Sequence, residues 1–190
     1  MESPPAARFL LASTSPRRRE ILELLRVPFD AVAPDYEETE GDPVAHAVGK
    51  ARSVLAAADG RPVLGCDTEV VCGGRVYGKP AGPAEAEEML ESLSGRTHEV
   101  MSGLALLTPM WEEVRHEVTR VTFRGLTPRD IARSVASGEW EGRAGGYAIQ
   151  GQGAALVERI EGDYLNVVGL PAGLLVRILA DRFPGLYGVG

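Results

Sequence analysis

A short apolar run, residues 8–12, breaks directly into hydroxyl groups, a proline and three arginines. The run predicts a buried strand, and the apolar residues at helical spacing after Pro16 predict an amphipathic helix. Ser15 is a suitable helix N-cap whose hydroxyl can accept a backbone N–H, and Pro16 suits the first helical position. The junction therefore predicts a strand, a tight turn and a helix in succession.

This turn concentrates groups that bind anions. A helix N-terminus carries unsatisfied backbone N–H groups and about half a positive charge. Arginine presents paired N–H donors that match two phosphate oxygens. Arginines in the first turn of a helix are unfavourable beside the positive end of the helix dipole, so their presence here calls for a second explanation. Two interpretations stay open: a capped helix with solvated arginines, or a polyphosphate site formed by Ser13, Ser15, Arg17 and Arg18.

Length and charge narrow the class of protein. A chain of 190 residues is one domain or a closely joined pair of lobes, with room for a sizeable core. Its net charge of −7 has the wrong sign for a protein that holds nucleic acid, so we expect no nucleic-acid partner. Residues 1–7 have no basic region, and the apolar run behind them is too short for a signal peptide or a membrane span. We therefore expect a cytoplasmic protein without a membrane partner.

The remaining pattern mixes strands and helices without strict alternation, which predicts an α/β fold with a mixed sheet flanked by helices. Asp42 and Pro43 open a helix whose apolar stripe leaves Lys50 and Arg52 to one side. Gly73 and Gly74 predict a tight hairpin. We expect strands at 27–33, 63–72, 75–77, 97–108, 112–123 and 155–158, and helices at 83–93, from Thr127 to about Ser137, and after Pro171.

Acidic residues provide a second set of candidates. The loop 35–42 holds five carboxylates, including Glu37 and Glu38, and is either a solvated turn or a source of ligands for a hard cation. Asp67 interrupts an apolar strand, and an unpaired buried carboxylate is costly. Asp67 is therefore either a catalytic or metal-binding group or an acceptor for backbone N–H groups at a strand end.

Other polar and glycine-rich features receive simpler interpretations. Residues 142–153 contain five glycines, which predicts either a flexible loop or a backbone held close to a flat ligand by Tyr147, Ile149 and Gln150. The three histidines, His46, His98 and His116, lack ligand spacing and are interpreted as surface or packing residues. Cys66 and Cys72 have neither zinc nor redox spacing and are interpreted as small strand residues.

Together these candidates suit the cleavage of a phosphoanhydride. Basic groups, including Lys50 and Lys79, hold the charged tail, carboxylates hold a divalent ion, and one carboxylate deprotonates the attacking water.

Short motifs in the same order along nearly the whole chain carry a resemblance to a known family. The motifs are Leu11-Ala12-Ser13, Ser15-Pro16-Arg17-Arg18, Cys66-Asp67-Thr68, Gly78-Lys79-Pro80, Ser94-Gly95-Arg96-Thr97-His98, Ala144-Gly145 with Tyr147, Ile149-Gln150-Gly151 and Asn166-Val167-Val168-Gly169-Leu170-Pro171. On these motifs the chain resembles the Maf family of nucleoside triphosphate pyrophosphatases. The resemblance implies that residues 1–190 form a single domain of two lobes, of the inosine-triphosphatase-like type, with the nucleotide in a cleft between the lobes. It also implies hydrolysis of a nucleoside triphosphate to the monophosphate and pyrophosphate with Mg²⁺ or Mn²⁺.

The resemblance also implies roles for single residues. Asp67 would be the proton acceptor and a metal ligand, with Glu37 or Glu38 assisting the metal or the water. Arg17, Thr68 and Gln150 match the branch of the family that acts on dTTP and UTP, whereas the branch acting on 7-methyl-GTP tends to have Trp, Gln and Glu there. Glu69 departs from the pattern, because the family commonly has an apolar residue at this position. The expected phosphate contacts come from Ser13, Arg17, Arg18, Lys50 and Lys79.

Two alternatives to the enzyme stay open. One is a nucleotide-binding regulator of cell division or septum formation with little turnover, and the other is a nucleic-acid-binding module. Asp67 argues against pure binding, because a carboxylate near phosphates weakens affinity unless a metal or a proton transfer uses it. The acidic net charge argues against the second alternative. The sequence does not fix the oligomeric state, and a homodimer is one open alternative.

Overall fold

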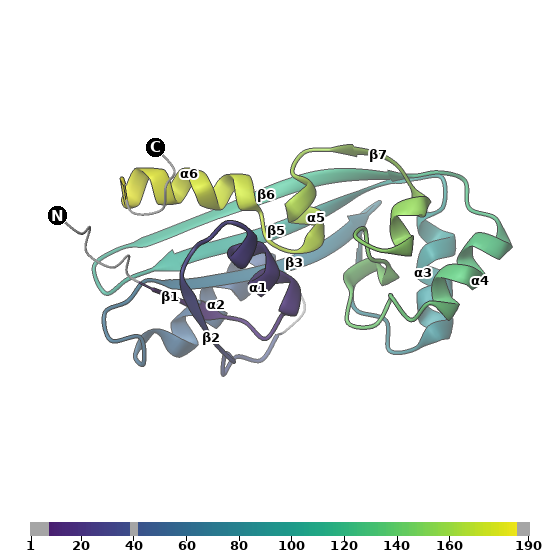
Figure 1. Ribbon diagram of the computed structural model, residues 1–190. Coiled ribbons are helices and arrows are strands. Elements are labelled where there is room, and N and C mark those ends of the chain that lie inside the picture. Colours follow the sequence, from purple (N-terminus) through teal and green to yellow (C-terminus); the bar gives the residue numbers. More distant parts are fainter. Residues whose placement is uncertain (1–7, 39–41, 186–190) are drawn as a thin grey trace. The chain divides into compact units, whose positions relative to one another are not determined.

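A computed structural model of the chain, which describes residues 8–38 and 42–185, is organised around one mixed sheet (Figure 1). Its strands are β1 (Phe9–Ala12), β2 (Phe29–Val32), β3 (Val63–Cys72), β4 (Arg75–Tyr77), β5 (Thr97–Leu107), β6 (Glu112–Phe123) and β7 (Val157–Glu161). They lie in the order β2-β1-β3-β5-β6-β7, with β4 paired to β3. β1 is parallel to β2 and to β3, whereas β4 is antiparallel to β3 and β7 is antiparallel to β6.

Helices flank this sheet, so the predicted α/β fold with a mixed sheet is confirmed. The helices are α1 (Pro16–Leu24), α2 (Pro43–Leu55), α3 (Pro83–Leu93), α4 (Pro128–Ala136), α5 (Tyr164–Val168) and α6 (Ala172–Arg182). Two short 3₁₀ turns, η1 (Ala144–Gly146) and η2 (Gln152–Leu156), lie in the glycine-rich segment.

The chain divides into two compact units. Unit 1 comprises Met1–Asp67, Ser102–Glu117 and Gly169–Gly190, and unit 2 comprises Thr68–Met101 and Val118–Val168. The three long strands β3, β5 and β6 contribute residues to both units. The extent of the single domain predicted for residues 1–190 stays a prediction.

In unit 1, helix α2 packs closely against the sheet because two strand positions are glycine. A Cβ atom on Gly65 of β3 would lie 2.1 Å from the carbonyl oxygen of Ala47. A Cβ atom on Gly103 of β5 would lie 2.3 Å from the carbonyl oxygen of Pro43. The polar residues on the sheet-facing side of α2 are therefore brought close to β3. The buried core under the helix consists of Leu10, Ala12, Ala47, Ala51, Val54, Ala58, Val63, Ala105 and Leu107.

Helices α1 and α2 of unit 1 begin with different caps. The Asp42 carboxylate accepts from the Val44 backbone N–H at 2.8 Å, as expected for the N-cap before Pro43. Ser15 is the N-cap of α1, but its hydroxyl makes no capping hydrogen bond, so that detail of the prediction was wrong. Instead the Ser13 hydroxyl accepts from the Ser15 backbone N–H, because it lies inside the turn.

In unit 2, aromatic residues occupy the core. His98 contacts Tyr147 through a 2.9 Å hydrogen bond between Nε2 and the phenol oxygen, and its ring packs edge-on against Phe123. Tyr147 and Ile149 are both buried, and the approach of this backbone segment to a flat ligand stays a prediction. Burial raises the pKa of Tyr147 above its usual range.

Several predicted boundaries shift, each for a local reason. The last strand is β7, beginning at Val157 rather than Ala155, because residues 152–156 form the 3₁₀ turn η2. The short helix α5 was not predicted; the Asp163 carboxylate accepts the backbone N–H groups of Leu165 and Asn166 and so favours a helical turn. The strand predicted at 27–33 is shorter, Phe29–Val32. Cys66 and Cys72 are buried strand residues, as predicted.

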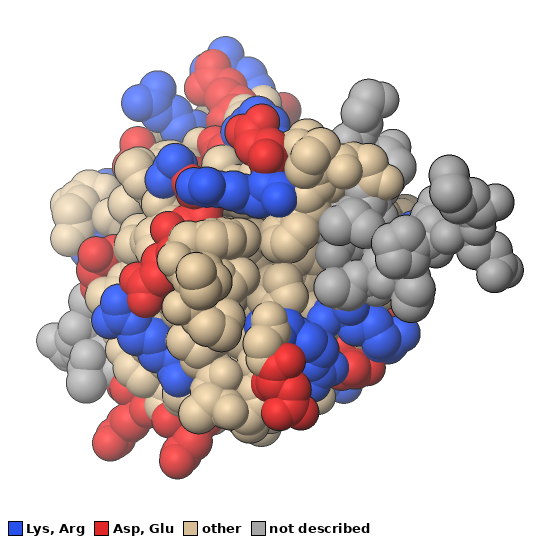
Figure 2. All heavy atoms as spheres, turned by 90° about the vertical axis from the view of Figure 1, so that its left-hand side faces the viewer, with Lys and Arg blue, Asp and Glu red and all other residues tan. Residues whose placement is uncertain are grey.

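None of the helices within the described part of the chain has the length and apolar character needed to cross a membrane. On the face shown in Figure 2, Lys and Arg side chains are interspersed with Asp and Glu side chains and with uncharged residues.

Candidate active site

The turn between β1 and α1 is fixed by Ser13. This side chain is 4% exposed, and its hydroxyl accepts from the Ser15 backbone N–H at 3.1 Å and from Arg18 Nη1 at 3.3 Å. Arg18 is buried, and its Nε donates to the carbonyl oxygen of Gly169 at 2.9 Å. Arg18 therefore joins the turn to the segment before α6, while Ser15 and Arg17 of the same turn are half-buried.

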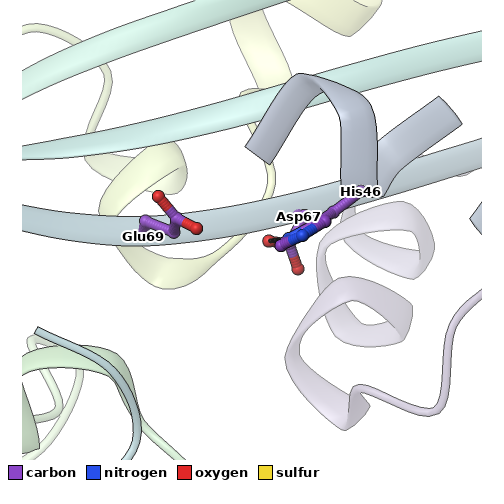
Figure 3. Close-up of side chains that lie close together, drawn as sticks. All are labelled: His46, Asp67 and Glu69. Carbon is purple, nitrogen blue, oxygen red and sulfur yellow. Dashed lines mark hydrogen bonds and ion pairs between the residues drawn. The ribbon is translucent and has the colours of Figure 1, made fainter. Parts of the chain in front are cut away.

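Asp67 lies on β3 and is held by two side chains of α2. Its Oδ1 lies 2.5 Å from Lys50 Nζ, and its Oδ2 lies 3.2 Å from His46 Nδ1. Figure 3 shows the imidazole of His46 directed at this carboxylate. All three residues are less than 9% exposed. The attraction between the buried ammonium and the buried carboxylate offsets part of the cost of removing both from water, and removing either one would leave an uncompensated buried charge.

The acidic loop before α2 contributes one carboxylate to the same lysine. Glu38 Oε1 lies 2.5 Å from Lys50 Nζ, and both Glu37 and Glu38 are exposed. The loop is anchored by Tyr36, whose ring packs directly on α2, since a Cβ atom on Gly49 would lie 2.1 Å from that ring. Tyr36 also packs edge-on against His46. Residues 39–41 of this loop lie outside the described residues.

The unit 1 residues supply ligand types suited to a divalent cation. The carboxylates of Asp67 and Glu38 converge on one ammonium group, and oxygen ligands of this kind suit Mg²⁺ and Mn²⁺. Glu69 follows Asp67 by two residues on β3, so its side chain leaves the same face of that strand (Figure 3). Among the described residues, one ligand atom each of His46, Asp67 and Glu69 lies within 4.8 Å of the other two, so this donor set fits a divalent cation.

Unit 2 carries the other predicted site residues. Thr68 is half-buried on β3, Lys79 is exposed after β4, and Gln150 is exposed between η1 and η2. The Gly145 backbone N–H donates to the carbonyl oxygen of Gly78 at 3.1 Å. This hydrogen bond ties the glycine-rich segment to the loop that carries Lys79.

The sequence matches the family described as Maf-like protein over residues 8–182. The chain belongs to the Maf family. It is similar to the dTTP/UTP pyrophosphatase of Gloeobacter violaceus, with 49% identity covering 92% of this chain and 95% of the relative. It is also similar to the dTTP/UTP pyrophosphatase of Moorella thermoacetica, with 49% identity covering 92% of this chain and 94% of the relative. The relative of that name from Deinococcus radiodurans is 43% identical and is covered over its full length, as is this chain.

Within this Maf family chain, sequence reasoning missed His46. It was interpreted as a surface or packing residue, but it is buried and contacts Asp67. The available signal was its position four residues before Lys50, since residues four apart share a face of a helix. The other two histidines differ from it: His98 is a packing residue in unit 2, and His116 is exposed.

Proposed function

We propose that this protein hydrolyses dTTP and UTP to the monophosphate and pyrophosphate. It is a hydrolase of the Maf family, and the observation that carries the substrate assignment is that relatives matching nearly its whole length are named dTTP/UTP pyrophosphatase. The buried group of Asp67 and Lys50 supports a reaction rather than binding alone, because a carboxylate beside a triphosphate weakens affinity unless the reaction uses it.

In the proposed mechanism, Asp67 is the general base. A water molecule attacks the α-phosphorus in line, the bond from that phosphorus to the bridging oxygen breaks, and pyrophosphate leaves. Asp67 accepts the proton of the attacking water, and Lys50 stabilises the negative charge that spreads over the phosphoryl oxygens. The short Lys50–Asp67 and Lys50–Glu38 contacts support this assignment, because they hold the ammonium beside the carboxylate that acts.

The phosphate tail is assigned to the turn between β1 and α1 and to Lys79. Ser13, Ser15, Arg17 and Arg18 lie at the start of α1, where backbone N–H groups and cationic side chains favour anions. Arg18 already makes two contacts inside unit 1, so it is held in place before any ligand binds. Lys79, on unit 2, is assigned to the same tail.

A divalent cation, Mg²⁺ or Mn²⁺, belongs to this proposal. Asp67 and Glu38 would hold it, with Glu37 as the alternative to Glu38. When bound, the cation would neutralise the charge that develops on the departing pyrophosphate. The convergence of two carboxylates on Lys50 supports the choice of Glu38.

The base is assigned to Gln150 and Thr68. The Gln150 amide can donate to O4 of a pyrimidine and accept from its N3–H, and the Thr68 hydroxyl can do either. Paired hydrogen bonds of this kind reject a base with the wrong edge more strongly than an apolar pocket would.

A panel of nucleoside triphosphates tests the proposal. The purified chain is incubated with Mg²⁺ or Mn²⁺ and each of dTTP, UTP, CTP, GTP and 7-methyl-GTP, and both products are measured. We expect equal amounts of monophosphate and pyrophosphate, fastest from dTTP and UTP. Tight nucleotide binding without turnover would instead support a regulator, and the net charge of −7 argues against a nucleic-acid module. The cytoplasmic location, the nucleotide cleft and the homodimer stay predictions.

A further inference from the structure

We propose that His46 is a positioning residue for Asp67. This role rests on the proposed function and adds His46 to the residues that serve the reaction. His46 and Lys50 lie one helical turn apart on α2, and each contacts a different oxygen of the Asp67 carboxylate. Lys50 Nζ lies at Oδ1 and His46 Nδ1 lies at Oδ2. Two contacts to two oxygens fix the rotation of the carboxylate, which one contact cannot do.

The direction of the hydrogen bond follows from the chemistry of the two groups. An ionised carboxylate only accepts, so the contact requires the proton on His46 Nδ1. Each carboxylate oxygen offers two lone-pair directions, and α2 uses one on each oxygen. One lone-pair direction on each oxygen is then left by these two contacts, and a carboxylate acting as a base needs one of them.

The surroundings of His46 hold the imidazole in this orientation. Its side chain is 6% exposed, and the Tyr36 ring packs edge-on against it. Gly49, on the same helix, leaves room for Tyr36 to lie against α2. The ring is therefore enclosed by its own helix, by β3 and by the loop that carries Glu38.

Without His46, the carboxylate can turn so that both oxygens approach the Lys50 ammonium. A base held in the wrong orientation lowers the rate of proton transfer more than it lowers the binding of substrate. The expected signature is a loss in kcat with little change in KM.

Two substitutions separate positioning from packing. His46→Leu removes the N–H donor and fills the space of the ring with an apolar side chain. His46→Asn places an amide N–H near the position of Nδ1. For UTP hydrolysis we expect His46→Leu to lower kcat about ten- to a hundredfold with KM changed less than about twofold. We expect His46→Asn to recover kcat to within about threefold of the wild type, because it restores the donor. The matched control is His116→Asn, an exposed histidine on β6, which should leave both constants unchanged.

A double-mutant cycle with Asp67→Asn tests whether His46 acts through Asp67. In the Asp67→Asn background, His46→Leu should not lower the residual rate further. An equal loss in both backgrounds would overturn the proposal, and so would a His46→Asn variant as slow as His46→Leu. Urea unfolding shows whether each variant is folded. A double-mutant cycle calculated from the free energies of unfolding measures the strength of the His46–Asp67 contact, and it does not depend on catalytic activity. A wild-type protein that hydrolyses nothing would refute the proposed function, and its unfolding cycle would still report on the contact.

Discussion

At the scale of single residues, burial changes the protonation of His98. Burial lowers the pKa of this imidazole to about 4, whereas an exposed histidine titrates near 6.5. Between these values the unfolded chain binds a proton that the folded chain does not. The free energy of unfolding therefore falls as the pH falls through this window, by about 2 kcal/mol from pH 7 to pH 5 for this group.

The His98→Gln variant isolates this effect, because glutamine does not titrate and can still bond to Tyr147. Urea unfolding at pH 7 and pH 5 should show a smaller loss of stability in the variant than in the wild type, by about 2 kcal/mol. Equal losses in the two proteins would show that His98 is protonated in the folded protein over the same pH range as in the unfolded chain.

A second residue-scale prediction concerns the selection of the base by Gln150. In Gln150→Glu the amide donor is lost and two acceptors face each other at O4 of UTP, whereas the C4 amino group of CTP can donate to the new carboxylate. The ratio of kcat/KM for UTP over CTP should fall by roughly tenfold or more. The matched control is Gln152→Glu, which adds the same charge two residues away on another exposed side chain. The same fall in both variants would point to charge rather than base reading.

A third prediction separates the two cations assigned to the phosphate tail. Arg18→Ala should weaken triphosphate binding and also lower stability, because Arg18 bonds to Ser13 and to the Gly169 carbonyl. Lys79→Ala should weaken triphosphate binding without lowering stability, since Lys79 is exposed. Titration of dTTP and of thymidine into each variant, together with urea unfolding, checks this. Equal losses of affinity for the nucleoside and the triphosphate would move either residue away from the phosphates.

The residue types of the site were readable from the sequence, but their burial was not. Lys50 and Arg52 both lie beside the apolar stripe of α2, yet Lys50 is buried against Asp67 and Arg52 is exposed and pairs with Glu112. Helical periodicity cannot distinguish these two positions, because the difference comes from partners on β3 and β6. His46 was missed for the same reason.

At the scale of elements, the contact between α2 and β3 decides whether the site forms. Gly65→Ala would place a methyl group 2.1 Å from the Ala47 carbonyl oxygen, so α2 must move away from the strand. We expect a loss of about 1–3 kcal/mol in the free energy of unfolding, the usual range for overpacking, together with lower activity. The control is Gly82→Ala, where the added methyl group meets open space. A Gly65→Ala variant as stable and active as Gly82→Ala would show that α2 is not held by this contact.

The elements themselves were largely predictable. Strands β3 and β6 and helix α3 begin and end where the apolar pattern and the turn residues predict. The misses, α5 and the start of β7, depend on hydrogen bonds from Asp163 and on a 3₁₀ turn over Gln152–Leu156. Both depend on short-range hydrogen bonds of side chains and backbone, which the spacing of apolar residues does not reveal.

At the scale of the whole molecule, the proposed chemistry is divided between the two units. The residues assigned to the water, the metal and most of the phosphate contacts belong to unit 1, and those assigned to the base belong to unit 2, as does Lys79. Substitutions in unit 1 should therefore affect kcat for all nucleotides alike, whereas substitutions of Gln150 and Thr68 should change the preference among them.

The measurement that tests the central claim is the rate of pyrophosphate release from UTP by the wild type and by Asp67→Asn. Lys50 keeps Glu38 as a partner in this variant, so the fold is expected to survive, and circular dichroism checks it. The account predicts turnover by the wild type and a kcat lower by roughly 10² to 10⁴ in Asp67→Asn, the usual effect of removing a general base. A folded Asp67→Asn variant that releases pyrophosphate at the wild-type rate would contradict it.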